Sequence, residues 1–99
     1  MKVTLARIAD IHEDRALEVD FFGRSILLVK AGDRINAFAN TCTHAAGPLL
    51  FEDGRFRCEW HGATFNARSG QREDGPGPYP LIRLPTRVEG DDLVYVYGE

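Results

Sequence analysis

The sequence has only two cysteines among its 99 residues, and it contains neither a long apolar run nor a cluster of basic residues. Two cysteines are too few for a secreted disulfide scaffold. No segment approaches the roughly 18 consecutive apolar residues of a membrane span, and the N-terminus lacks an apolar stretch typical of a signal peptide, so we expect a cytoplasmic location. A net charge of -3 without a basic patch argues against nucleic-acid binding.

The composition is that of one small folded domain. Apolar residues make up 43% of the chain and aromatic residues 10%, which is enough for a hydrophobic core. A chain of this length buries roughly 60 to 70% of the surface that its unfolded form exposes, so one core is feasible and two are not. We therefore expect a single domain over residues 1–99, present as a monomer.

Short stretches of alternating apolar residues, separated by turn residues, predict a chain built almost entirely of β-strands. Strands are expected over 3–8, 15–22, 25–30, 35–39 and 63–67, and in a C-terminal hairpin over 84–97. The early strands form a meander, and Asp53-Gly54 predicts a tight hairpin turn. Because no segment shows a helical period over three turns, the expected fold class is all-β with antiparallel sheets.

Residues 71–80 are rich in glycine and proline. This composition is typical of a rigid connection between strands. A stiff loop so close in sequence to a possible metal site could equally cover that site, and the sequence leaves both interpretations open.

Both cysteines stand close to a histidine, in the pairs Cys42-Thr43-His44 and Cys58-Glu59-Trp60-His61. Thiolate and imidazole groups bind zinc and iron, and small residues around each pair let the two loops fold over one ion or cluster. The candidate metal ligands are therefore Cys42, His44, Cys58 and His61. A disulfide between the two cysteines is the alternative. His12 has no partner residue, and we interpret it as a solvated loop histidine.

The ligand types leave two kinds of site to consider. Zinc accepts two cysteines and two histidines, which would make the chain a zinc-stabilised interaction module without a redox role. Zinc fingers, however, tend to pair cysteine with cysteine and histidine with histidine, whereas each loop here contributes one of each. Mixed pairs suit a Rieske-type [2Fe-2S] cluster, in which two histidines replace two cysteines on one iron.

The segments CTHAAGPL, CEWHGATFNARSG and GPGPYPL, within about residues 40 to 97, resemble Rieske-type ferredoxins and the Rieske domains of aromatic-ring oxygenases. The resemblance implies a Rieske-like antiparallel β-sandwich with a small cluster-binding subdomain of two loops. That subdomain would cover about 40–80, and a base domain would comprise 1–39 and 81–99.

The resemblance also implies the role of each ligand. Cys42 and Cys58 would bind the inner iron of a Rieske-type 2Fe-2S cluster, and His44 and His61 the outer iron. High-potential Rieske proteins place a hydroxyl residue after the His-Gly pair, where this chain has Ala63. Hydrogen bonds to sulfur stabilise the reduced cluster, so we expect a potential in the lower part of the Rieske range of roughly -150 to +300 mV.

The function implied by the resemblance is that of a free-standing ferredoxin. It would carry single electrons from a flavin-dependent or NADH-linked reductase to a terminal oxygenase, with no catalytic residues of its own. The small subunit of an assimilatory nitrite reductase is a second interpretation within the same redox family. Trp60 is either an exposed docking residue or part of the packing of the ligand loop.

Overall fold

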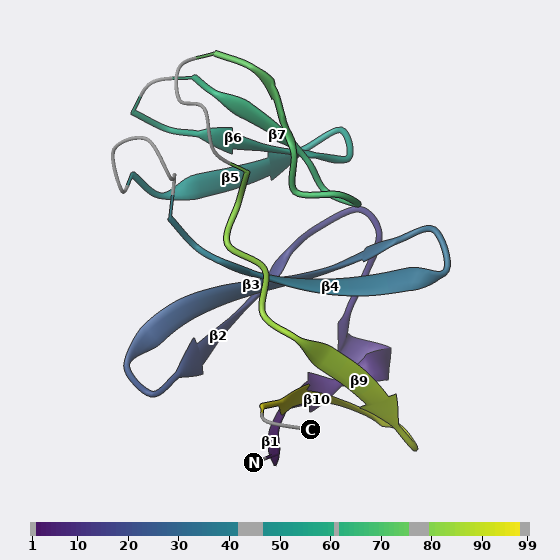
Figure 1. Ribbon diagram of the computed structural model, residues 1–99. Coiled ribbons are helices and arrows are strands. Elements are labelled where there is room, and N and C mark those ends of the chain that lie inside the picture. Colours follow the sequence, from purple (N-terminus) through teal and green to yellow (C-terminus); the bar gives the residue numbers. More distant parts are fainter. Residues whose placement is uncertain (1, 42–46, 61, 76–79, 98–99) are drawn as a thin grey trace.

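The computed structural model describes residues 2–41, 47–60, 62–75 and 80–97. These residues form ten strands and one short 3-10 helix, Ile8–Asp10 (Figure 1). The strands are β1 (Lys2–Arg7), β2 (Leu17–Phe21), β3 (Arg24–Ala31), β4 (Arg34–Ala39), β5 (Leu49–Glu52), β6 (Arg55–Cys58), β7 (Thr64–Asn66), β8 (Arg72–Asp74), β9 (Thr86–Glu89) and β10 (Asp92–Val96). The predicted all-β class is confirmed. Within the described residues, no helix is long and apolar enough to span a membrane.

The strands pair into three antiparallel sheets, ordered β1-β10-β9, β2-β3-β4 and β5-β6-β7-β8. In Figure 1 the four-stranded sheet lies at one end of the molecule and the β1-β10-β9 sheet at the other, with β2-β3-β4 between them. The chain enters the four-stranded sheet after β4 and returns after β8, along a segment that leads to β9. The predicted meander is present as β2-β3-β4, without β1, which pairs with β10, and the predicted C-terminal hairpin is present as β9 and β10.

Two hairpins turn through a pair of residues with positive φ, Phe22-Gly23 after β2 and Asp53-Gly54 after β5. Positive φ at both central residues defines a type I′ turn, whose twist matches that of the flanking strands. The prediction of a tight turn at Asp53-Gly54 is confirmed. Phe22 is an unusual residue for such a turn, since asparagine, aspartate and glycine are the usual choices.

Two features of the fold differ from the sequence prediction. The prediction of a loop over 71–80 is wrong for 72–74, which form β8 as an edge strand of the four-stranded sheet. All three β8 residues are exposed, so the strand carries no apolar alternation. The 3-10 helix at Ile8–Asp10 is also unpredicted, because a single turn is too short for a helical period.

Strand β3 is buried on both faces because its side chains alternate between two apolar cores. Leu27 and Val29 join a core shared with the four-stranded sheet, whereas Ile26 and Leu28 join a core shared with β10. This position explains why the strand is a continuous apolar run rather than an alternation with polar residues. The middle sheet thus connects the two ends of the molecule.

Asn36, on β4, is the buried polar residue that fastens the four-stranded sheet to the middle sheet. Its Nδ2 donates hydrogen bonds to the carbonyl oxygens of Ala67, at 2.9 Å, and Arg68, at 3.0 Å. Both carbonyls lie in the turn after β7. One side chain therefore satisfies two backbone acceptors of the other sheet, which would otherwise lack these partners.

We predict that Asn36→Leu lowers the free energy of unfolding by about 1 to 3 kcal/mol, because the carbonyl of Ala67 loses this donor and that of Arg68 keeps the bond from Arg83, while the number of side-chain heavy atoms is unchanged. Gln71→Leu is the matched control, since it removes an exposed amide. Urea denaturation of both variants measures the difference. Equal stability of the two variants would contradict the fastening role.

Candidate metal centre

Cys58 is the last residue of β6, and its side chain is 0% exposed. It is a free cysteine that packs in the core with Phe56, Phe65 and other apolar residues, so the structure gives no support to the disulfide alternative. The other three predicted ligands, Cys42, His44 and His61, lie outside the described residues. A buried free thiol at a strand end suits the predicted role of an inner, water-shielded iron ligand.

The segment that follows Cys58 is closed by two backbone hydrogen bonds. The amide of Cys58 donates to the carbonyl oxygen of Ala63 at 2.8 Å, and the amide of Gly62 donates to the carbonyl oxygen of Cys58 at 3.0 Å. Gly62 has a φ of 73°, a conformation that favours glycine. These bonds fix both ends of the segment in which the sequence holds His61.

The residues just after the first predicted pair lie against the second pair. Leu49, the first residue of β5, is the register partner of Cys58, and the amide of Glu59 donates to the carbonyl oxygen of Pro48 at 3.0 Å. A methyl group on Gly47 would come within 2.8 Å of Trp60 Cδ2, so only glycine allows the indole to lie there. The described flanks of both predicted pairs therefore meet at the open end of the β5–β6 hairpin, opposite the turn at Asp53-Gly54.

Asn40 links the described residues on either side of the 42–46 segment. Its Oδ1 accepts a hydrogen bond from the amide of Leu49 at 3.0 Å. Its Nδ2 donates to Ser25 Oγ at 3.1 Å and to a carboxylate oxygen of Glu18 at 3.4 Å. Asn40 was not predicted as a site residue. The signal in the sequence was a polar amide between a strand and the first cysteine, a position where asparagine bonds to nearby backbone.

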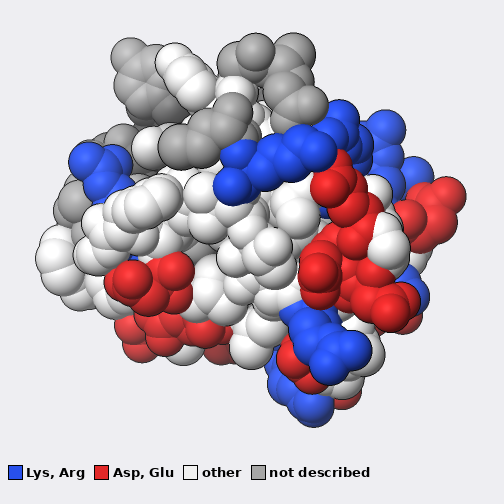
Figure 2. Space-filling view, turned by 90° about the horizontal axis from the view of Figure 1, so that it is seen from below, with Lys and Arg blue, Asp and Glu red and all other residues white. Residues whose placement is uncertain are grey.

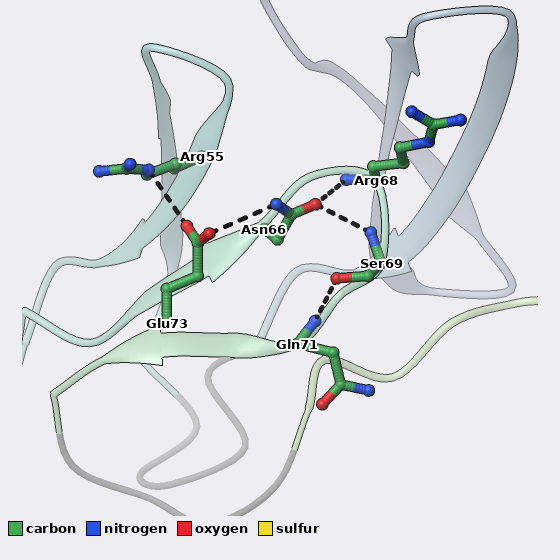
Figure 3. Close-up of polar contacts among 6 residues, drawn as sticks. All are labelled: Arg55, Asn66, Arg68, Ser69, Gln71 and Glu73. Carbon is green, nitrogen blue, oxygen red and sulfur yellow. Dashed lines mark hydrogen bonds and ion pairs between the residues drawn. The ribbon is translucent and has the colours of Figure 1, made fainter.

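A polar network anchors β8 to its neighbour β7 and to β6, the next strand of the sheet (Figure 3). Glu73 pairs with Arg55 Nε at 3.1 Å and accepts a hydrogen bond from Asn66 Nδ2 at 3.3 Å. Asn66 Oδ1 in turn accepts from the amides of Arg68 and Ser69 in the following turn. Strand β8 is thus held in place by polar contacts instead of an apolar face.

Anchoring β8 brings Gly75 against the backbone of Ala63. A methyl group on Gly75 would come within 2.5 Å of Ala63 Cα, and the φ of Gly75 is 88°. Glycine is therefore required for two reasons, space and backbone conformation. The Gly/Pro-rich segment thus touches, at Gly75, the segment that begins at Cys58, whereas residues 76–79 lie outside the described part of the chain.

The basic neighbour of Cys58 is paired at the surface. Arg57, which precedes Cys58 on β6, forms an ion pair of 2.7 Å with Glu52 on β5. The hydrogen bond that Arg57 donates to Glu52, followed by the negative charge of Glu52, raises the pKa of Arg57. Trp60 is 62% exposed although part of its ring lies against Gly47. The structure thus gives Trp60 both a packing contact and an accessible surface.

We predict that Gly47→Ala destabilises the protein and reduces its iron content, because the added methyl group overlaps the Trp60 ring. The expected fall in melting temperature is roughly 4 °C or more, which corresponds to at least about 1 kcal/mol in a domain of this size. Combined with Trp60→Ala, the same substitution should cost little, since the obstructing ring is gone. Melting temperature and iron per chain are measured for both single variants and the double variant, and strictly additive effects would contradict the contact.

Comparisons with known proteins agree with this geometry. The family model described as "Rieske [2Fe-2S] domain" matches residues 1–86 of this chain. The mouse protein named apoptosis-inducing factor 3 is 33% identical over 96 residues, which cover 94% of this chain and 16% of that protein. The chain therefore spans a small part of the length of this curated relative.

Two solved structures share the fold. The ferredoxin of Sphingomonas yanoikuyae B1 superposes with a TM-score of 0.81 at 17% identity, covering 96% of this chain and 97% of that one. The ferredoxin of carbazole 1,9a-dioxygenase from Nocardioides aromaticivorans IC177 gives a TM-score of 0.78 at 22% identity, covering 96% of each chain. Together with the family match, these likenesses support the all-β Rieske fold. The chain belongs to the Rieske [2Fe-2S] domain family, whose cofactor is a Rieske-type [2Fe-2S] cluster.

Proposed function

We propose that this domain is a one-electron carrier of the ferredoxin type, which accepts electrons from a flavin-dependent or NADH-linked reductase and delivers them to a terminal oxygenase. The observation that carries the proposal is the position of Cys58. It is a buried, free thiol at the open end of the β5–β6 hairpin, where described residues that flank the other cysteine–histidine pair also lie. The proposal includes a monomeric carrier in the cytoplasm.

Cys42 and Cys58 would hold the inner iron, and His44 and His61 the outer iron. When bound, a Rieske-type cluster supplies a reversible one-electron couple centred on the histidine-bound iron. The contribution of Cys58 is to keep water away from its thiolate, because its side chain has no exposed surface.

The described backbone supports a potential in the lower part of the Rieske range. The amides of Cys58 and Gly62 donate to backbone carbonyl oxygens, so these two donors are already used within the protein. Ala63 offers a methyl group where a hydroxyl would donate to sulfur. Fewer hydrogen bonds to the sulfurs favour the oxidised form and lower the potential.

The choice of partner rests on likeness. One structural neighbour is, by its name, the ferredoxin of a dioxygenase. The exposed part of Trp60, next to the predicted ligand His61, offers a partner an aromatic contact, and such residues often dominate protein interfaces. Both points favour electron delivery to an oxygenase.

The curated relative favours a second candidate. In the mouse protein a region similar to this chain makes up only 16% of the length. A Rieske domain can therefore form part of a larger polypeptide. Its electron partner would then be another part of that polypeptide instead of a separate oxygenase. Both candidates share the one-electron role and differ in the partner.

We predict that the anaerobically purified protein is brown and contains two irons and two sulfides per chain, as its [2Fe-2S] family implies. Chemical reduction should give a rhombic EPR signal, with a midpoint potential in the lower half of roughly -150 to +300 mV. Electron paramagnetic resonance, metal analysis and a redox titration test this. A colourless protein with one zinc would sink the proposal and leave the zinc-stabilised module in its place.

We predict that His44→Cys lowers the midpoint potential by on the order of 100 mV or more, toward the value of about -400 mV typical of ferredoxins with four cysteine ligands. A thiolate adds negative charge where a neutral imidazole had been. His12→Cys is the matched control, because His12 lies in the connection between β1 and β2 and lines a surface hollow with Asp10 and Arg15. A His44→Cys protein with unchanged spectrum and potential would refute the ligand assignment.

A further inference from the structure

A groove of about 510 Å³ lies between the middle sheet and the segment that returns from β8 to β9. Its apolar lining includes Phe21, Ile26, Ile82, Leu84 and Tyr95, contributed by β2, β3, the returning segment and β10. The groove is open to solvent and is not an enclosed cavity. It offers an apolar floor that the protein leaves accessible.

A row of aromatic rings extends this floor over the surface. The Phe21 ring lies 4.7 Å from both Phe22 and Tyr95, and Tyr95 stacks on Tyr97 at 6.4 Å, measured between centroids. Phe22 is 72% exposed, and Ile82 on the other side of the groove is 54% exposed. Exposed apolar residues scattered singly are ordinary, but a continuous row beside a groove indicates a contact surface.

Phe22 contradicts two local preferences at once. It occupies the first central position of a type I′ turn with a φ of 52°, where a side chain with a Cβ is strained and asparagine or glycine is favoured. The turn also places a large apolar ring in water. Residues that break local rules without a structural gain are expected at functional positions.

The charges of the groove have a single sign. Arg24 and Arg83 are its charged lining residues, although the chain as a whole carries a charge of -3. Arg83 also donates to the carbonyl oxygen of Arg68 at 2.6 Å, whereas the side chain of Arg24 has no hydrogen bond or ion pair with any described residue. Asp20 lines a different hollow, and Glu18 is engaged by Ser25 and Asn40.

No acidic residue among those described lines the groove. On the face shown in Figure 2, acidic side chains lie in separate groups with uncharged surface between them. An anionic group entering the groove therefore meets a free guanidinium and no carboxylate among the lining residues. Charge and shape agree on an occupant that is apolar and negatively charged.

We propose that this groove binds an extended segment of a partner protein, in which an aromatic or aliphatic side chain stands next to a carboxylate. The apolar side chain would fill the floor between Ile82 and Tyr95, and the carboxylate would pair with Arg24. Small-molecule sites enclose most of their ligand. An open groove whose lining residue Phe21 contacts exposed Phe22 fits a chain segment better than a small molecule.

The test uses the holoprotein and two blocked synthetic peptides, Gly-Glu-Phe-Glu-Leu-Gly and its counterpart with lysine in place of glutamate. Titration followed by 15N NMR should give saturable shifts at β3, 82–85 and β10 with the acidic peptide. Binding of the lysine peptide should be at least tenfold weaker. Equal binding of both peptides, no binding of either, or shifts confined to another surface would overturn the proposal.

Three variants separate docking from folding. Phe22→Asn should weaken binding of the acidic peptide at least fivefold while raising the melting temperature, because asparagine suits the turn. Arg24→Ala should weaken the acidic peptide and leave the lysine peptide unaffected. Val88→Asn, which removes an exposed apolar side chain outside the groove lining, is the control and should bind normally.

Other occupants give different results. Self-association in sedimentation experiments that Phe22→Asn abolishes would assign the groove to a second copy of this chain and overturn the proposal. Tighter binding of benzoate than of the acidic peptide would assign it to a small aromatic acid, with the same consequence. Retained peptide binding by the Phe22→Asn protein would show that the aromatic row plays no part.

Discussion

The register between β5 and β6 is the constraint on which the candidate metal centre depends. Side chains alternate between the two faces of a strand, so a slip of one residue would move Cys58 from the buried face to the exposed one. The two-residue turn at Asp53-Gly54 prevents this slip, because its positive φ angles suit one hairpin geometry. A feature of two residues thereby fixes both the burial of Cys58 and its pairing with Leu49.

The sheet that carries Cys58 does not have a core of its own. Its apolar residues Phe56 and Phe65 pack with Leu27, Val29 and Phe38 of the middle sheet. Asn36 adds hydrogen bonds across the same junction. The division near residues 40 and 80 stays a prediction, and one core contains residues from both sides of it. Strain at the metal centre would reach β3 and β4 through shared packing, since close-packed interiors transmit it.

The sequence predicts those parts of the fold that have a local signal. Alternation and turn residues identify the strands of the meander and of the C-terminal hairpin, and Asp53-Gly54 identifies its own turn. The pairing of β1 with β10 has no local signal, because it joins the two ends of the chain. Strand β8 has none either, since its side chains are exposed and polar contacts hold it.

The candidate site likewise contains some residues that the sequence predicts and others that it does not. The spacing of cysteines and histidines, with the family resemblance, identifies the predicted ligands, and the structure adds the burial of Cys58. Asn40, Gly47 and Gly75 escaped prediction because each matters through a neighbour distant in sequence, respectively Ser25, Trp60 and Ala63. Periodicity and spacing describe a residue's own segment and carry no information about such tertiary partners.

The small residues beside Cys58 connect packing with redox chemistry. Ala63 has no exposed surface, and a methyl group on Gly75 would come within 3.1 Å of its Cβ. A hydroxyl on residue 63 would therefore need space in a region that is already closely packed. The missing hydrogen-bond donor is thus tied to the close approach of β8, which the Arg55–Glu73 ion pair and Asn66 help to maintain. The proposed low potential would then follow from the way the four-stranded sheet is closed, so tuning the potential upward would require loosening the contact between residues 63 and 75 as well as adding a donor.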